Sequence, residues 1–186
     1  MRQMRDVASA LAFLHQKGIA YGDLRSRNIL VDGQHGNLKA LLSDFGCAED
    51  FGDLLISNRD IQMRDSLGWL SPEIWRNYRL YGQGRVFDGG ARDMWAFGCT
   101  MVEVLARERF PWPIGYDDNT IGDALISYER PPRLPSFPPW DEAWRFIHDR
   151  CWCIDPSQRI TAHEAITELE ALSKSKPYVD DVPKDD

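Results

Sequence analysis

The sequence is 186 residues long, which is enough for one domain with a hydrophobic core but leaves little room for two. Hydrophobic residues make up 43% and charged residues 27%, a balance typical of globular proteins that excludes a fully disordered or fibrous chain. The net charge of −7 argues against general binding to nucleic acid or to an anionic membrane, because both require a basic surplus.

The N-terminal segment fits two interpretations. Arg2 and Arg5 precede a short apolar run, which is the pattern of a secretory signal peptide. Four of its apolar residues, however, fall on one face of a helix: Val7, Ala10, Leu11 and Leu14. Because Gly18 then provides a helix end, we favour an amphipathic helix of the folded domain over a signal peptide.

The cysteines and the hydropathy pattern indicate a cytoplasmic protein. The cysteines lack the paired spacing of a zinc site and are expected to be thiols in a reducing compartment. They are Cys47, Cys99, Cys151 and Cys153. No apolar run approaches the roughly 20 residues that a bilayer requires, so no membrane span is expected.

The segment after the first helix predicts a β-hairpin. Residues 29–31 and 38–42 are typical of two short strands, and the polar, glycine-containing segment between them is typical of a turn. The residues from there to Leu70 show weak periodicity and are expected to form a long loop. Long loops in compact domains are usually functional or mobile.

The second half of the chain is predicted to be helical. Pro72 suits the first position of a helix, and residues 91–106 are apolar on nearly every side, which indicates a central buried helix. Further helices are expected over residues 119–127, 140–152 and 161–172. Three tryptophans are expected to pack in the core: Trp140, Trp144 and Trp152. The predicted fold is therefore mainly α with a small β-hairpin.

Oxygen-bearing side chains flank the predicted hairpin. Asn28 precedes the first strand and Asp44 follows the second, so a short hairpin brings them side by side. Their oxygens suit Mg²⁺, which is usually held by one or two carboxylates together with substrate phosphates. Asp23 is close enough to act on a hydroxyl at this corner, and Arg25 adds a positive charge for a phosphoryl group. The alternative is that Asp23 and Asp44 only cap turns.

The chain resembles eukaryotic protein kinases at five segments that follow in the family's order. The catalytic loop and the magnesium-binding Asp-Phe-Gly motif are similar to YGDLRSRNILV and SDFG. The Ala-Pro-Glu motif is similar to LGWLSPE, and the central helix to RDMWAFGCTMVEVL. The signature before the last helix is similar to CWCIDPSQR. The resemblance implies the large C-terminal lobe of a protein kinase over residues 1–173, followed by an acidic, disordered tail over residues 174–186.

The resemblance assigns a role to each residue of the oxygen-rich corner. Asp23 would accept the proton of the substrate hydroxyl, and Arg25, where the family commonly has Lys, would contact the γ-phosphate of ATP. Asn28 and Asp44 would hold Mg²⁺ ions that bridge the phosphates. The implied activity is phosphoryl transfer from Mg-ATP to a protein hydroxyl.

The resemblance also implies residues that support the site. Asp93 would accept backbone N–H bonds from the catalytic loop, although an acid near a helix N-terminus also has a plain structural role. Glu73 and Arg159 would form a buried ion pair. The motifs add four more supporting residues: Tyr21, Phe45, Gly46 and Ser66. The aromatic ring of Tyr21 is expected to pack under the ring of Phe45.

Two departures from the family weaken the expected activity. Gly22 stands where the family usually has Arg, as in a non-RD kinase. Phosphorylation of Ser57 or Ser66 is therefore not expected to order the loop through a side chain at position 22. Nothing in the chain matches the small N-terminal β-rich lobe, whose glycine-rich loop and Val-Ala-Ile-Lys lysine cover the ATP phosphates. This polypeptide alone is therefore expected to bind ATP and Mg²⁺ weakly and to be inactive or weakly active.

Other functions stay open from the sequence alone. Small-molecule phosphotransferases of the aminoglycoside and choline type carry a similar His-Gly-Asp loop but lack the activation segment. A pseudokinase or scaffold would use the helical body to bind partners. Among protein kinases, the motifs favour Ser/Thr over Tyr specificity. The expected partners are a protein substrate and a small lobe or regulatory protein supplied by another segment.

Overall fold

The computed structural model describes residues 1–34, 37–51, 67–81, 88–108 and 110–175, and these are mostly helical. The α-helices are α1 (Arg2–Gln16), α3 (Pro72–Tyr81), α4 (Gly89–Ala106), α5 (Asp118–Ile126), α6 (Asp141–Arg145) and α7 (Ala162–Ser175). The shorter helical segments are η1 (Ser26–Asn28), η2 (Leu67–Trp69), η3 (Phe146–Cys151) and η4 (Pro156–Gln158). The strands are β1 (Ile19–Ala20), β2 (Ile29–Asp32), β3 (Lys39–Leu42) and β4 (Glu49–Asp50).

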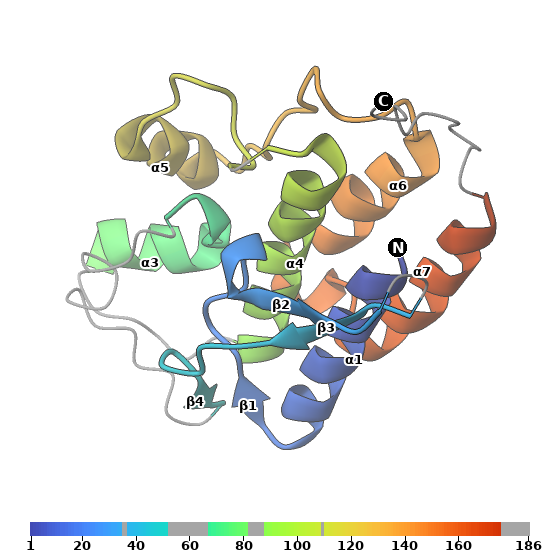
Figure 1. Ribbon diagram of the computed structural model, residues 1–186. Coiled ribbons are helices and arrows are strands. Elements are labelled where there is room, and N and C mark those ends of the chain that lie inside the picture. The colour runs from blue at the N-terminus through green and yellow to red at the C-terminus, as the bar shows by residue number, and fades with distance from the viewer. Residues whose placement is uncertain (35–36, 52–66, 82–87, 109, 176–186) are drawn as a thin grey trace.

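Helix α4 runs through the middle of the molecule, with the other helices around it (Figure 1). Every residue from Gly89 to Glu103 is buried, because this sequence is apolar on nearly all sides. The helix begins where the Asp88 carboxylate accepts hydrogen bonds from the N–H groups of Gly90 and Ala91, at 3.0 and 3.3 Å. The predicted central helix is confirmed, and its start lies two residues earlier because Asp88 caps it.

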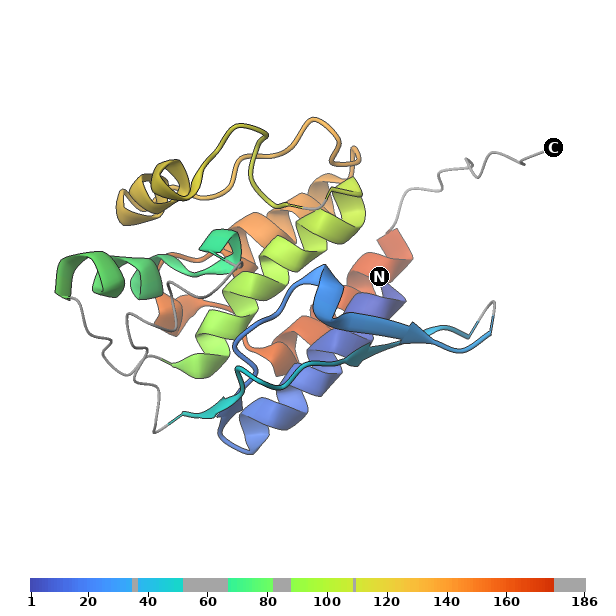
Figure 2. The ribbon, with the colours of Figure 1, turned by 60° about the vertical axis from the view of Figure 1, so that its left-hand side comes forward.

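Helices α1 and α7 lie side by side (Figure 2). The buried face of α1 consists of Met4, Val7, Ala8 and Leu11, as an amphipathic helix requires. Helix α7 begins with a capping box, in which the Thr161 N–H donates to Glu164 Oε2 at 2.9 Å and the Glu164 N–H donates to Thr161 Oγ1 at 3.2 Å. Lys174 and Ser175 belong to this helix rather than to the expected tail, whose remaining residues lie outside the described ranges.

Two small antiparallel sheets lie beside α1 and α4. Strands β2 and β3 form the predicted hairpin, with Ile29 opposite Leu42 (Figure 1). Strand β1 pairs with β4, which places Ala20 opposite Glu49. This second sheet was not predicted, because strands of two residues are too short to show an alternating pattern.

Tryptophans attach the C-terminal helices to α4. Trp95 of α4 and Trp152 are fully buried, and their ring centroids lie 6.0 Å apart. Trp144 meets Trp152 edge to face at 5.8 Å, and Trp140 is buried too, which confirms their predicted core role. The single helix predicted over residues 140–152 is instead α6 followed by the π-helix η3, a local widening that apolar periodicity does not reveal.

A buried ion pair joins α3 to the segment before α7. The Arg159 guanidinium donates to both Glu73 carboxylate oxygens, at 2.7 and 3.1 Å. Arg159 Nη1 also donates to the Ala91 carbonyl oxygen at 2.8 Å, which ties the pair to α4. The ion pair expected between Glu73 and Arg159 is therefore present.

All four cysteines are free thiols, and burial raises the pKa of Cys99 and of Cys151. Among the helices that the structure describes, none combines the length and the hydropathy that a membrane span requires.

Candidate active site

Asp23 lies between β1 and β2, in residues 21–28, which we call the Asp23 loop. The Asn28 side-chain amide fixes this loop, because its Nδ2 donates to Asp23 Oδ2 and to the Asp23 carbonyl oxygen, both at 2.8 Å. Arg25 Nη2 lies 3.3 Å from the same Oδ2. Three of the four residues expected at the oxygen-rich corner are therefore in direct contact.

The other carboxylate oxygen of Asp23, Oδ1, is buried and has no hydrogen-bond partner among the described residues. The Asp23 side chain is 10% exposed, and it lines a small cavity together with Gly22, Trp69 and Leu70. Leaving such an oxygen unpaired costs on the order of 1–3 kcal/mol, so a water molecule, an ion or a bound substrate is expected to pair with it. Oδ1 is the atom of this carboxylate that can accept a hydrogen bond from a bound group.

Asp44 follows β3 in a tight turn, residues 43–46, which we call the Asp44 turn. Its backbone φ is 54°, a left-handed conformation that Asp adopts more readily than most residues, and its Oδ1 accepts from the Gly46 N–H at 3.2 Å. Ser43 donates from its N–H and from its hydroxyl to the Asn28 carbonyl oxygen, at 2.9 and 3.0 Å. Asp44 is thus one residue away from a direct contact with Asn28, and it is exposed.

Tyr21 joins the Asp23 loop to the Asp44 turn. Its hydroxyl donates to the Ser43 carbonyl oxygen, and its ring meets the Phe45 ring edge to face at 5.5 Å. Burial raises the pKa of the Tyr21 phenol, and the nearby carboxylates of Asp23 and Asp44 raise it further. The phenol therefore stays protonated and remains a hydrogen-bond donor. The expected contact with Phe45 is present, although Phe45 is itself 52% exposed.

Asp93 of α4 holds the start of the Asp23 loop. Its Oδ2 accepts from the Tyr21 N–H at 2.7 Å, and its Oδ1 accepts from the Gly22 N–H at 2.9 Å. His15 Nε2 lies 2.9 Å from Oδ2 as well. The structure thus contains the backbone contacts expected of Asp93, and it adds His15, which sequence reasoning did not single out.

Glu103, near the other end of α4, holds the middle of the Asp23 loop. Its carboxylate accepts from the Ser26 hydroxyl at 2.6 Å, from the Ser26 N–H at 3.1 Å and from Trp69 Nε1 at 2.8 Å. Burial raises the pKa of Glu103, and these hydrogen bonds only partly offset that effect. Glu103 was not predicted. An acid inside an otherwise apolar helix is nevertheless a signal, because a buried carboxylate must find hydrogen-bond donors.

The side chains at this corner fit a magnesium ion. Asn28 directs its Nδ2 at Asp23, so its amide oxygen remains for a cation, and Asp44 adds a carboxylate. Within the described ranges, no group of three or more His, Cys, Asp or Glu side chains could hold a metal by itself. A cation here would need phosphate or water oxygens as further ligands, which is how Mg²⁺ is usually bound. Ser57 and Ser66 lie outside the described residues.

Comparison with known proteins identifies the family. The protein kinase domain family matches residues 1–169. The serine/threonine-protein kinase BCK1/SLK1/SSP31 of Saccharomyces cerevisiae is 30% identical over 166 residues, which cover 87% of this chain and 10% of that protein. The mitogen-activated protein kinase kinase kinase mkh1 of Cytospora mali is 31% identical over 169 residues, which cover 88% of this chain and 8% of that protein.

A third relative has a similar relation to the chain. The MAP kinase kinase kinase mkh1 of Schizosaccharomyces pombe is 29% identical over 168 residues, which cover 87% of this chain and 14% of that protein. The chain therefore spans only between 8% and 14% of the length of these relatives. Because the family match covers nearly all of the sequence, this chain belongs to the protein kinase domain family.

Proposed function

We propose that the domain containing this chain transfers the γ-phosphoryl group of Mg-ATP to a Ser or Thr hydroxyl of a protein, with Asp23 as the base. The observation that carries the proposal is the asymmetry of the Asp23 carboxylate. Its Oδ2 is fixed by Asn28 and Arg25, whereas its Oδ1 is buried, unpaired among the described residues and at the edge of a cavity.

Asp23 Oδ1 would accept the proton of the substrate hydroxyl as that oxygen attacks phosphorus. Its partners support this role, because Asn28 and Arg25 fix the carboxylate plane and leave one oxygen for the substrate. The Asp93 and Glu103 bonds hold the loop backbone on both sides of Asp23. Holding a base in place lowers the barrier, because the reacting groups need no reorganisation.

Asn28 and Asp44 would hold Mg²⁺ through the amide oxygen and the carboxylate. When bound, the ion supplies positive charge that neutralises the ATP phosphates. Arg25 is buried, its Nη2 lies 3.3 Å from Asp23 Oδ2, and its positive charge partly offsets the raised pKa of Glu103. It adds fixed positive charge next to the base, where a transferring phosphoryl group would sit.

The relatives' names guide the choice of substrate. One is named a serine/threonine-protein kinase, and others are named kinases of MAP kinase kinases. We therefore propose a Ser or Thr residue as the acceptor and another protein kinase as the first substrate to test. The proposed Ser/Thr specificity rests on the names of these relatives, because the contacts around Asp23 suit any alcohol.

Phosphotransfer by the Asp23→Asn variant tests the proposal. Single-turnover transfer at millimolar Mg-ATP detects even slow reactions, which matters because the 186 residues include neither a glycine-rich loop nor its lysine. We expect Asp23→Asn to lower the rate by about 10²–10⁴-fold, the usual effect of losing a general base. The control is Asp118→Asn, which removes an exposed carboxylate from α5 and should leave the rate unchanged.

A wild-type rate in Asp23→Asn would contradict the base role. If partner binding survives both Asp23→Asn and Asp44→Ala, the pseudokinase or scaffold alternative is supported instead.

A further inference from the structure

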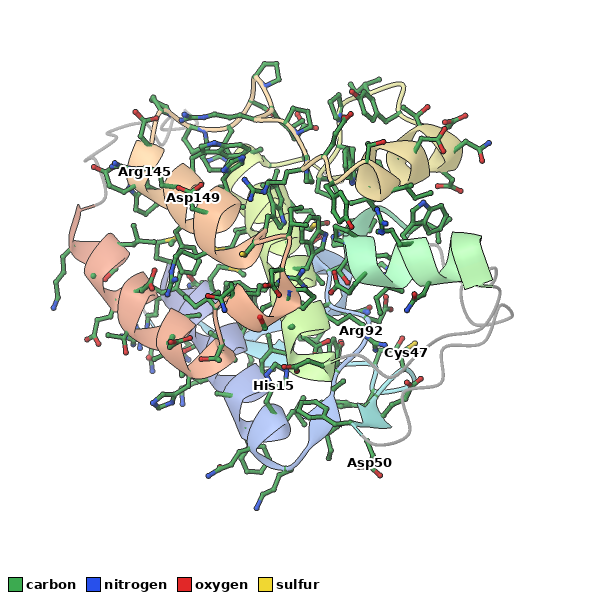
Figure 3. All side chains as sticks on the ribbon, turned by 180° about the vertical axis from the view of Figure 1, so that it is seen from behind. His15, Cys47, Asp50, Arg92, Arg145 and Asp149 are labelled. Atoms are coloured by element: carbon green, nitrogen blue, oxygen red, sulfur yellow. The ribbon has the colours of Figure 1, made fainter. Side chains whose placement is uncertain are left out.

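Gly22 of the Asp23 loop has no room for a side chain. Its φ is 84°, which already favours glycine. A β-carbon added there would fall far inside contact distance of two groups, the Arg92 guanidinium and the Cys47 carbonyl oxygen. The backbone of the Asp23 loop, the end of the Arg92 side chain and the backbone after the Asp44 turn therefore meet at one point. Figure 3 shows Arg92 and Cys47 as neighbours on the rear of the molecule.

Arg92 brings a buried positive charge to this point. It belongs to the first turns of α4, is only 3% exposed, and precedes Asp93, which holds the N–H groups of Tyr21 and Gly22. Arg92, Asp93 and Asp23 also line the same small cavity. A buried cation is stable only where opposite charges or dipoles compensate it, and the carboxylates of Asp23 and Asp93 provide negative charge.

We propose that Arg92 is a positioning residue for Asp23: it fills the space of the missing side chain at position 22 and holds the Asp23 loop against the Cys47 backbone. In this arrangement, the side chain that fills the space next to position 22 comes from α4 instead of from the Asp23 loop. Gly22 and Arg92 then depend on each other, because a side chain at 22 requires the guanidinium to leave. The effect of Arg92 on the chemistry of Asp23 rests on the proposed function. The mutual fit, by which we mean the packing of the Arg92 side chain against Gly22, does not.

The mutual fit is tested by the labelling rate of the Cys47 thiol. In a Cys153→Ser background, Cys47 is the one cysteine that is not buried. Gly22→Ala and Arg92→Ala should each speed Cys47 labelling, because each loosens the backbone at residue 47. In the Arg92→Ala background, Gly22→Ala should have a smaller effect than in the wild type, because only the collision with the Cys47 carbonyl oxygen remains. Independent effects of the two substitutions would overturn the proposal.

Two further variants guard against a simple loss of folding. Arg92→Met keeps the aliphatic stem, and it should still speed Cys47 labelling while thermal unfolding stays cooperative. Arg145→Met, on α6 where the arginine side chain is 67% exposed, is the matched control and should change nothing. An unchanged labelling rate in Arg92→Met would also overturn the proposal.

Single-turnover kinetics separate positioning from general support of the fold. We expect Arg92→Met to lower the transfer rate by about 10²-fold without changing the affinity for Mg-ATP, the effect of a slightly misplaced base. Arg92→Lys should recover part of the rate, because it keeps the charge. Equal losses in Lys and Met, or a loss of affinity alone, would refute positioning. If Asp23→Asn proves as active as the wild type, the proposed function fails, and the thiol experiment still decides on Arg92.

Discussion

Tyr21 shows how a single side chain can connect both halves of the site. Its hydroxyl bonds to the Ser43 carbonyl, and its ring packs on Phe45. A histidine at this position would titrate near neutral pH. The raised pKa of Tyr21 keeps the phenol neutral instead. The link between the Asp23 loop and the Asp44 turn is therefore insensitive to pH over the physiological range.

Tyr21→Phe isolates the hydroxyl, since the ring contact with Phe45 is kept. Because the Ser43 carbonyl oxygen loses a donor in a partly buried place, we expect the free energy of unfolding to fall by about 1 kcal/mol. Urea unfolding measures this change. Tyr116→Phe, at an exposed position, is the control. Equal losses in the two variants would show that the Tyr21 hydroxyl contributes nothing specific.

At the level of elements, helix α4 holds the Asp23 loop at two places. Asp93 binds the start of the loop, and Glu103 binds Ser26. These acids are ten positions apart in one helix, which corresponds to ~15 Å along its axis. Glu103 also binds Trp69, so it links the loop to η2. The distance between the two places at which the Asp23 loop is held is thus set by the length of helix between Asp93 and Glu103. The packing of α4 in the core fixes this helix.

The pH dependence of stability tests the Glu103 anchor. Burial raises the pKa of this carboxyl in the folded state, so its contribution is fully present below the ordinary glutamate pKa and is lost as the pH rises through the raised value. Glu103→Gln cannot titrate. We therefore expect the stability advantage of the wild type over Glu103→Gln to shrink as the pH rises from about 4 toward 7. Urea unfolding at a series of pH values measures it, and a constant or growing advantage would contradict the expectation.

The anchors on α4 mark a limit of inference from sequence. The apolar run predicts that the helix is buried, and the resemblance to kinases points to Asp93. The sequence does not show which loop faces Glu103 or Arg92, because those partners lie 77 and 70 positions away and are set by packing. A charged residue inside an apolar helix predicts a buried anchor but does not identify the group it binds.

At the scale of the whole molecule, the Glu73–Arg159 pair joins segments 86 positions apart. The Arg159 side chain has no exposed surface, and the Glu73 side chain is 10% exposed. Glu73→Gln should lower the free energy of unfolding by about 3–5 kcal/mol, because it strands a buried guanidinium. Replacing both residues with methionine should cost less than Glu73→Gln. Asp141→Asn, which breaks an exposed pair with Arg133, is the control. A larger loss in the double variant would show that the pair itself stabilises the fold.

The sequence predicts the parts of this fold that depend on regular patterns. Apolar residues on one helical face predict α1, and a run that is apolar on nearly every side predicts α4. Turn residues between two short apolar runs predict the β2–β3 hairpin. The hairpin in turn predicts that Asn28 and Asp44 lie side by side, and the structure places Ser43, the residue before Asp44, in contact with Asn28. The β1–β4 sheet and the π-helix carry no such pattern, because a strand of two residues and a single wide turn depend on their neighbours.

The two anchors on α4 also divide the site into a stationary and an adjustable part. The segment from Tyr21 to Ser26 is hydrogen-bonded at both ends to helix α4, so thermal displacement of Asp23 follows that of the core. Asp44 is exposed, and the residues around it contact the loop mainly through Ser43 and Tyr21. Under the proposed function, any change of shape during turnover would then fall on Asp44, the carboxylate proposed to hold the ion, while Asp23, the proposed proton acceptor, keeps its place.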